Sequence, residues 1–508
     1  MAILLLFTAI FAWRAGETRI ASGYLDPVAK IQAQDEAVYS HAALRMAAQG
    51  DWSTPHFMDR YFLYKPPLLY WSAAASVKAL GASALALRLP SILAAACVCA
   101  LVFRHAGWLA AALTASNLLF FTMARRNMTD APLCLAVVGM WALLQSDRRL
   151  ELRRSQILAA VSIAAAILVK STAGVIPAAI LCVAWLAERF PLSRLARVLA
   201  GSLCISAPWF VYQYALHERW FWGEFVEVEL LAFGAGAPPQ TTPEAAASFY
   251  ARRLWEMDPW LCAMALVALP ALIRAWRDRP VLLAWIVITA AAIAGYQYRN
   301  ATYLLPLIPA LAIVAGAHGP LPRPVGWAVG TALLAWRMYG GYYTPQNTLV
   351  GAELAERRCE MRRANELILV GAEEQFYATV LAMPRVRYAF PGDGHVAKGF
   401  SLDFREMGVV LSIDEFLSLD AARAKYAPRL AAWGLPNDRA LGAVIAMPRP
   451  GDLARLVESS PAADFLIPAA AKGQLGRVPH LVQPDESGNL LLLAAKQPTS
   501  RPTGPCRM

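Results

Sequence analysis

Charged residues are scarce in this sequence. They make up 16% of the 508 residues, and 58% of the residues are hydrophobic, whereas a soluble protein carries about a quarter charged residues. The scarcity extends to about residue 339, where apolar stretches alternate with short arginine-rich segments. A soluble single-domain protein is therefore excluded. We predict a membrane domain over residues 1–339 and a separate soluble domain over residues 340–508.

A basic face is also missing, although the formal net charge is +11. Most arginines lie in short segments beside apolar stretches, where they orient helices in a membrane. A nucleic-acid-binding protein would gather them on one soluble face. We therefore expect membrane lipids around this chain and no nucleic-acid partner.

The first apolar run, residues 2–13, has no basic stretch before it and no small-residue cleavage signal after it. These absences favour a first transmembrane helix over a signal peptide. The run is short for a span, and whether its beginning is complete stays open. Six of the eight cysteines lie in apolar segments. Cys359 and Cys506 lie in the soluble part, where a disulfide and two free thiols are both possible.

Apolar stretches mark eleven candidate membrane spans. They cover residues 1–13, 86–103, 108–123, 131–146, 156–169, 172–187, 197–215, 259–276, 281–297, 302–317 and 323–339. Segment 66–82 is also apolar but opens with two prolines. If this segment lies along the interface, the arginine-rich loops all fall on one face, which the positive-inside rule makes cytoplasmic. They contain Arg148, Arg149, Arg153, Arg154, Arg189, Arg194, Arg197, Arg274, Arg277 and Arg279.

This topology places most of the unusual polar residues on the opposite, outer face. That face receives the first outer loop, 14–85, the outer loop 216–258 and the soluble domain. It also receives the turns at 124–130 and 298–301 and the end of the helix at Lys170. Charges near membrane depth are costly and mark functional cavities.

The first outer loop carries two polar motifs. Asp35 and Glu36 open a stretch of helical spacing, where acidic residues either complement the helix dipole or act as a base at the membrane surface. Tyr61 to Trp71 includes Lys65, Pro66 and Pro67. Lys65 is either an interfacial anchor or a point charge for a phosphate.

The order of these motifs resembles the aminoarabinose transferase family, within the protein O-mannosyltransferase-like (GT-C) glycosyltransferases. The resemblance covers about residues 1–320. It rests on Asp35-Glu36, Gly50-Asp51-Trp52, Tyr61 through Trp71, Arg88-Leu89-Pro90-Ser91, Ala124-Arg125, Asp130-Ala131-Pro132-Leu133, Leu168-Val169-Lys170, Pro208-Trp209 and Tyr303-Leu304-Leu305-Pro306.

The resemblance implies a mainly α fold: a polytopic transmembrane helical bundle of about 11–13 spans with a small C-terminal α/β domain. It implies a donor sugar carried on undecaprenyl phosphate, with the active site and C-terminal domain on the periplasmic side of the bacterial inner membrane. Two departures concern a metal. The family's glutamate before Lys-Pro-Pro is Tyr64 here, and a position that is often histidine holds Glu229, ahead of Ala232-Phe233. We therefore expect no metal and no other cofactor.

The resemblance and the chemistry together predict a set of site residues. A departing lipid phosphate gathers negative charge, which favours cations aimed at it. Asp35 is the first candidate for a catalytic base and Asp130 a second carboxylate. The predicted substrate-binding residues are Glu36, Tyr39, Tyr61, Lys65, Lys170, Arg299 and Tyr303. Structural alternatives are a helix cap for Asp130, snorkelling for Lys170 and a plain loop charge for Arg299.

The C-terminal domain lacks a glycine-rich phosphate loop, a metal-spaced His/Cys cluster and a catalytic triad. Segments 367–371, 408–411 and 490–493 are typical of strands, and segments 350–363, 374–382, 414–432 and 451–458 of helices. The pattern predicts a small α/β domain. Its location alone suggests a lid or an acceptor-docking role.

Three functions remain open at this stage. The first is a glycosyltransferase that moves a sugar from a polyprenyl-phosphate donor to lipid A, another glycan or a protein hydroxyl. The second is a flippase for a lipid-linked sugar, which would favour paired repeats that this sequence lacks. The third is an inactive relative that only binds polyprenyl phosphate.

Overall fold

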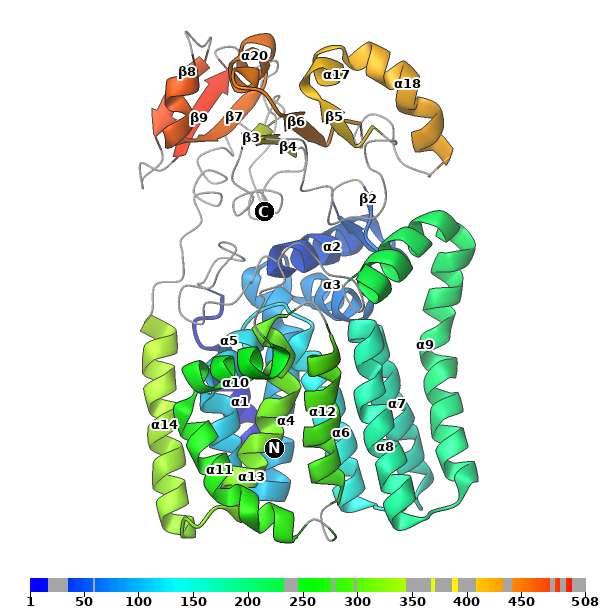
Figure 1. Ribbon diagram of the computed structural model, residues 1–508, viewed down its shortest axis with the longest axis vertical. Helices are drawn as coiled ribbons and strands as arrows, with labels where there is room; N and C mark the ends of the chain where they lie inside the picture. The colour runs from blue at the N-terminus through cyan, green and yellow to red at the C-terminus, as the bar shows by residue number, and fades with distance from the viewer. Residues whose placement is uncertain are drawn as a thin grey trace.

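The described part of the chain forms a bundle of long helices and a smaller domain built on a β-sheet, as Figure 1 shows for the computed structural model. The predicted fold class is therefore confirmed. The structure describes residues 1–16, 35–57, 60–232, 245–275, 277, 280–296, 299–343, 367–370, 386–391, 408–432, 441–475, 480–484 and 490–495.

Each predicted span falls on helices of the bundle. The helices are α1 (Ala2–Ala12), α4 (Ala84–Ser116), α5 (Leu118–Ala124), α6 (Asp130–Ser146), α7 (Arg153–Lys170), α8 (Val175–Glu188), α9 (Leu192–Phe221), α11 (Pro259–Arg274), α12 (Pro280–Gly295), α13 (Ile308–His318) and α14 (Arg323–Tyr343). The gap between the predicted spans 86–103 and 108–123 corresponds to a break inside α4 at Gly107 (φ 86°, ψ −177°). The predicted span 108–123 is itself interrupted at Asn117, beyond which the chain continues as α5.

Length and hydropathy single out four stretches of the described chain as membrane spans: Ala84–Ser116, Arg153–Glu188, Leu192–Leu231 and Ala301–His318. A fifth arises if α10 (Ala246–Met257) and α11, which meet at 114°, form one span. Shorter apolar helices lie beside them, so the chain is a multi-pass membrane protein. The count of 11–13 spans stays a prediction.

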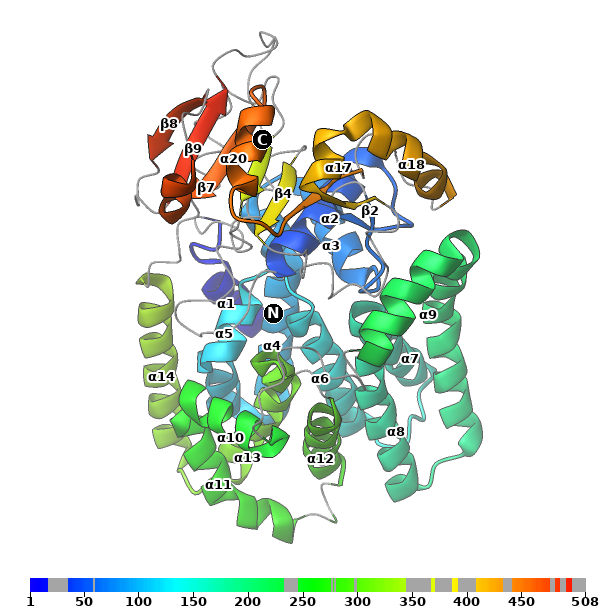
Figure 2. The ribbon, with the colours of Figure 1, turned by 45° about the horizontal axis from the view of Figure 1, so that its top comes forward.

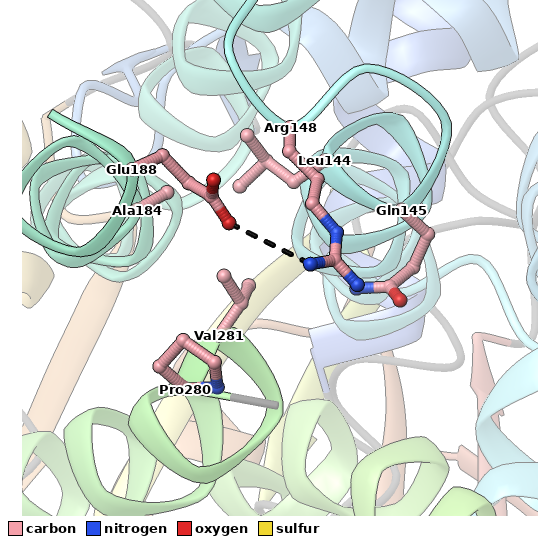
Figure 3. Close-up of a pocket in the computed structure, with 7 residues that line it drawn as sticks. All are labelled: Leu144, Gln145, Arg148, Ala184, Glu188, Pro280 and Val281. Carbon is pink, nitrogen blue, oxygen red and sulfur yellow. Dashed lines mark ion pairs between the residues drawn. The ribbon is translucent and has the colours of Figure 1, made fainter. Parts of the chain in front are cut away.

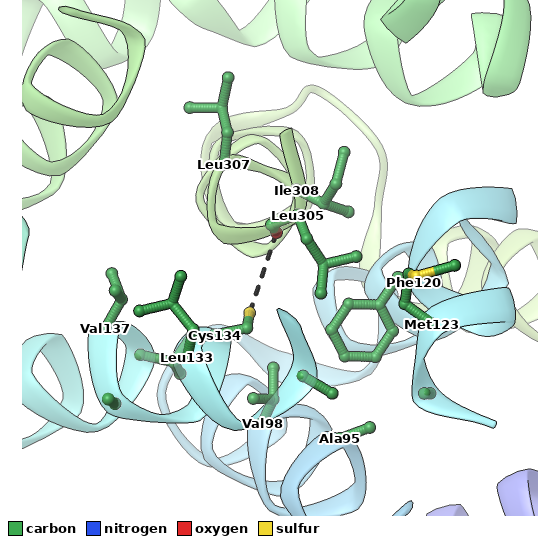
Figure 4. Close-up of a cluster of buried hydrophobic side chains, with 14 of the residues drawn as sticks. Ala95, Val98, Phe120, Met123, Leu133, Cys134, Val137, Leu305, Leu307 and Ile308 are labelled. Carbon is green, nitrogen blue, oxygen red and sulfur yellow. Dashed lines mark hydrogen bonds between the residues drawn. The ribbon is translucent and has the colours of Figure 1, made fainter. Parts of the chain in front are cut away.

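Small side chains let the helices of the bundle approach closely. At Gly316 of α13, a Cβ atom would lie 2.6 Å from the backbone nitrogen of Ala110 on α4, so only glycine fits this crossing. Around Cys134 of α6, apolar side chains of α4, α5 and α13 interlock (Figure 4). The Cys134 thiol lies 3.8 Å from the carbonyl oxygen of Leu305. Leu305 belongs to η3 (Ala301–Leu307), the short 3₁₀ helix that directly precedes α13.

Two short helices, α2 (Asp35–Gln49) and α3 (Leu68–Leu80), lie across one end of the bundle, between it and the sheet domain (Figures 1 and 2). As predicted, the apolar segment after Pro66 and Pro67 does not span the bundle. The nearby hairpin is formed by β1 (His56–Phe57) and β2 (Arg60–Tyr61). At the same end, α9 bends at His217 and continues as a π-helix, η2 (Trp222–Ala232).

The arginine-rich loops gather at the other end of the bundle. The Arg194 guanidinium donates a hydrogen bond to the carbonyl oxygen of Arg149 at 3.0 Å. Arg148 lies 3.8 Å from Glu188, and both line a shallow pocket beside Pro280 at the start of α12 (Figure 3). The described parts of the loops that were predicted to share one face therefore do so, while Arg279 lies outside the described residues.

The C-terminal domain is built on a seven-stranded sheet in the order β5-β6-β4-β3-β7-β9-β8, in which the first five strands are parallel and the last two join antiparallel. The predicted strands are confirmed, whereas β4, β6, β7 and β8 were not predicted. Segments 350–363 and 374–382, Cys359 and Cys506 lie outside the described residues. The elements are β3 (Leu367–Val370), β4 (Val386–Pro391), β5 (Val410–Ser412), β6 (Val444–Met447), β7 (Asp464–Pro468), β8 (His480–Pro484), β9 (Leu490–Ala495), α17 (Ile413–Leu417), α18 (Leu419–Ala432) and α20 (Asp452–Ser459).

The two ends of the bundle should face different compartments. In a variant without native cysteines, Gln49→Cys at the α2 end should react with a membrane-impermeant maleimide in spheroplasts. Glu151→Cys at the arginine-rich end should react only after permeabilisation, because the positive-inside rule places it in the cytoplasm. Both positions are exposed in the structure. Equal labelling of the two in intact spheroplasts would contradict the topology.

Candidate active site

Asp35, at the start of α2, lies where charged residues of several segments meet. Tyr39, one helical turn later, donates a hydrogen bond from its hydroxyl to Asp35 Oδ2 at 3.3 Å. Burial raises the pKa of Asp35; the positive charges of Lys65 and Lys170 oppose that rise, and the Asp130 carboxylate adds to it. These four charged residues, predicted from separate segments, therefore share one site.

The neighbouring carboxylate, Glu36, has the opposite environment. It is fully buried and lies between two guanidinium groups. Arg88 donates to both of its oxygens, at 2.6 and 3.1 Å, and Arg126 lies 3.3 Å away. The backbone nitrogen of Asn127 donates to it at 3.1 Å. Although burial raises the pKa of Glu36, the two guanidiniums outweigh burial and lower it below its usual range.

Adjacent residues of α2 thus have pKa values that move in opposite directions. Such a separation marks which carboxylate exchanges a proton and which stays charged. The pKa of Asp35 is raised toward a range useful for a base, while Glu36 is held as a permanent anion. Substrate binding by Glu36 stays a prediction, and its contacts are those of a residue that fixes α2 to the bundle.

The second carboxylate, Asp130, pairs with a lysine. It is the first residue of α6 and is buried, and Lys170 Nζ at the end of α7 lies 2.8 Å from its Oδ1. The Lys170 ammonium also lies 4.8 Å from the centre of the Tyr303 ring, in a cation–π contact. Three of the predicted residues therefore form one contact chain. Lys170 does not simply extend toward water, and Thr129 rather than Asp130 occupies the cap position of α6.

Lys65 pairs with a buried acid of the π-helix. Its ammonium forms an ion pair with Glu229, whose side chain is 7% exposed. The hydroxyl of Tyr296 donates to the backbone oxygen of Glu229 at 3.1 Å. A second acid of the π-helix, Glu224, accepts a hydrogen bond from the backbone nitrogen of Leu63 at 2.6 Å. The π-helix therefore holds the segment around Lys65 at two points.

Two predicted residues lie beside this cluster rather than in it. The Tyr61 ring packs against His217 at 4.0 Å and His56 at 5.3 Å. Arg299 lies near Tyr250 of α10, on which its charge acts. No described contact joins either residue to Asp35, so their roles in substrate binding stay predictions.

Sequence reasoning gave no role to Glu229, Arg88, Arg126 and Tyr70. The Tyr70 ring lies 5.8 Å from Tyr39, and its buried hydroxyl has no hydrogen-bond partner among the described residues. The sequence signal that could have identified such residues is a polar side chain within an apolar stretch. Glu229 stands between Val228 and Leu230, and a buried acid needs a partner.

A metal has no evident place in the described part of the site. No three His, Cys, Asp or Glu side chains of the described residues gather as metal ligands. At the two positions where the sequence departs from the family, the Tyr64 ring packs 5.3 Å from Phe62 and Glu229 pairs with Lys65. We derive no step through a metal, and its absence stays a prediction.

Comparison with known proteins agrees with this geometry. Residues 64–222 match the family described as dolichyl-phosphate-mannose-protein mannosyltransferase. The undecaprenyl phosphate-alpha-4-amino-4-deoxy-L-arabinose arabinosyl transferase of Erwinia tasmaniensis is 27% identical over 312 residues, which are 56% of this chain and 55% of that protein. That of Yersinia pestis is 27% identical over 314 residues, 56% and 54% of the two chains. The chain thus spans about half the length of the curated relatives it matches. The predicted resemblance to the aminoarabinose transferase-like family is confirmed.

Solved structures of this family extend the likeness to the fold. The crystal structure of ArnT from Cupriavidus metallidurans in the apo state aligns with a TM-score of 0.67 at 16% identity, over 97% of each chain. The structure of the same protein bound to undecaprenyl phosphate aligns with a TM-score of 0.63 at 16% identity, over 99% of each chain. The aminoarabinose transferase-like fold therefore includes both the bundle and the sheet domain.

The Glu36 network should be a main source of stability at the end of the bundle where α2 lies. Arg88→Met leaves a buried carboxylate short of its closest partner, which costs about 3 to 5 kcal/mol. Arg104→Met, at an exposed position of the same helix, is the matched control. The free energy of unfolding of both variants can be measured by denaturant titration in detergent micelles. A loss of stability for Arg88→Met no larger than that of the control would contradict a structural role for the network.

Proposed function

We propose that this chain is an integral membrane glycosyltransferase that moves a sugar from a polyprenyl-phosphate donor to an acceptor at the periplasmic face of the bacterial inner membrane. One observation carries the proposal. The charges of Lys65, Asp130 and Lys170, which come from three other segments, act on Asp35. Asp35 begins α2, the helix that lies across the end of the bundle away from the arginine-rich loops. The site thus combines a carboxylate of raised pKa with two cations.

The donor class follows from the charges and the surroundings. A lipid-linked phosphate requires cations at the membrane surface and apolar helices for its tail, and the bundle offers both. The names of the arabinosyl transferase relatives include undecaprenyl phosphate, which we take as the lipid carrier of the sugar. Relatives with this name transfer 4-amino-4-deoxy-L-arabinose, so a pentose is the first sugar to test. Lipid A, another glycan and a protein hydroxyl are the acceptors to compare.

Transfer requires one bond to form as another breaks. The acceptor oxygen attacks the anomeric carbon of the sugar, and the bond from that carbon to the phosphate oxygen breaks with its electron pair left on the phosphate. The transition state resembles an oxocarbenium ion. If the acceptor is a hydroxyl, Asp35 takes its proton. The new charge on the lipid phosphate is stabilised by Lys65.

The remaining residues of the cluster orient these groups. The Tyr39 hydroxyl holds the Asp35 carboxylate, and burial raises the pKa of Tyr39, so that it stays protonated and donates. Asp130 neutralises and orients Lys170. A carboxylate paired with lysine is a weaker base than one that is not, which makes Asp35 the better candidate. The buried Tyr70 hydroxyl has no hydrogen-bond partner among the described residues.

Replacement of the proposed base should stop transfer without loss of the fold. Asp35→Asn should lower the rate of transfer from a labelled polyprenyl-phosphate sugar in proteoliposomes by about 10²- to 10⁴-fold, because proton removal by a placed base contributes that much. Glu227→Gln, at an exposed acid near the same end, should leave the rate unchanged. A normal rate of transfer by Asp35→Asn would contradict the role of Asp35 as the catalytic base. Translocation without transfer by the wild type would favour a flippase, and binding alone an inactive relative.

The rate should fall at acidic pH because Asp35 must be ionised to accept a proton. Its pKa is raised by burial, so activity is present above that raised value and is lost as the pH falls through it. The hydrogen bond from Tyr39 favours the charged form. Tyr39→Phe should therefore move the acid limb of kcat/KM to higher pH. An acid limb that stays in place, or moves to lower pH, would contradict Asp35 as the titrating group.

A further inference from the structure

The π-helix η2 places two buried acids against the segment that carries Lys65. π-Helices are rare and occur mainly at functional sites. Glu224 binds the backbone of Leu63, and Glu229 pairs with Lys65, whereas Glu227, on the same helix, is exposed. The Glu224 contact explains how the segment is held in place. The Glu229 pair does more, because it neutralises the one charge that the proposed function assigns to the lipid phosphate.

A phosphate and Glu229 cannot both bind Lys65 closely without cost. Both are anions, and at short separation in a site shielded from water they repel each other strongly. The pair itself is protected from water, since Lys65 is 17% and Glu229 7% exposed. A lipid phosphate that reaches Lys65 must therefore displace the Glu229 carboxylate.

We propose that Glu229 is a resident counter-ion of Lys65 that the lipid phosphate replaces, so that this exchange sets how tightly the site holds the phosphate. The inference rests on the proposed function and deepens it by adding a positioning residue. No covalent bond changes in the exchange. The carboxylate leaves the ammonium as the phosphate arrives, and it returns when the lipid phosphate product departs. Lys65 thereby has an anionic partner in both states, and the returning carboxylate helps to release an otherwise strongly bound phosphate.

The surroundings of Glu229 provide a place for the displaced carboxylate. Tyr296 holds its backbone oxygen, so the residue keeps an anchor while the side chain turns. Tyr39 and Tyr70 lie within electrostatic reach of its carboxylate. The Tyr70 hydroxyl has no hydrogen-bond partner among the described residues and can donate to an arriving carboxylate. A donor in the right place lowers the cost of breaking the pair with Lys65.

The test is the affinity of the full-length protein for undecaprenyl phosphate in detergent solution. Glu229→Gln should tighten binding about tenfold and slow dissociation, because the phosphate then becomes the partner of a buried lysine that lacks one. Glu227→Gln on the same helix is the matched control and should bind like the wild type. A purely structural role of Glu229 would weaken binding on substitution. Unchanged or weaker binding by Glu229→Gln overturns the inference.

Two further variants guard against a folding defect. Glu229→Asp keeps the charge but withdraws it by one methylene, so its affinity should lie between those of the wild type and Glu229→Gln. The double variant Glu229→Gln/Lys65→Met, in which both members of the pair are neutral, should lose the tightened binding, because the gain in affinity acts through Lys65. If Glu229→Gln does not fold, an affinity of Glu229→Asp at or below that of the wild type overturns the inference. Tightened binding by this double variant would overturn the inference as well.

Undecaprenol, the same lipid without the phosphate, separates failure of this inference from failure of the proposed function. Affinity for undecaprenol should be the same in the wild type and in Glu229→Gln. If the wild type binds undecaprenyl phosphate more tightly than undecaprenol but Glu229→Gln shows no gain, only the counter-ion role is false. If neither protein distinguishes the two lipids, the donor class of the proposed function is false and the inference fails with it.

Discussion

The ion network of Glu36 fixes the geometry of the site. Its carboxylate is held by Arg88 of α4 and by Arg126 in the turn before α6, while Arg88 also donates to the carbonyl oxygen of Ala15 at 2.7 Å. One buried anion thus ties three parts of the chain to α2. Burial of these charges is costly and is tolerated because they are paired with one another. Because Asp35 precedes Glu36, the same bonds set where Asp35 lies.

A site that needs both a base and cations has to prevent them from neutralising one another. Here each lysine has its own acid, Lys65 with Glu229 and Lys170 with Asp130. Asp35 makes no ion pair among the described residues and receives only the hydroxyl of Tyr39. The charges therefore act on Asp35 across space without contact with it. This separation explains how a carboxylate close to two lysines keeps a raised pKa.

The sequence predicted those parts of the fold and site that depend on local patterns. Apolar stretches predicted the bundle helices, and the ordered motifs predicted Asp35, Lys65, Asp130 and Lys170 as one group. Pairings between distant positions were not predictable from one sequence, such as Lys65 with Glu229, 164 positions apart. Nor did hydropathy reveal the interruption at Asn117 between α4 and α5, because the residues on both sides of the bend are apolar. In the sheet domain, short strands such as β6 were not predicted, because their residues do not differ in composition from the segments around them.

The described residues of the sheet domain contribute no charged group to the cluster, yet this domain packs where the π-helix begins. Trp220 and Phe225, on either side of the start of η2, share one buried apolar cluster with Val410 of β5 and Tyr426 of α18. Packed clusters transmit displacement because they have few voids to absorb it. Glu229 lies about one helical turn beyond Phe225 on the same helix. Packing therefore connects the sheet domain to the helix that carries the partner of Lys65.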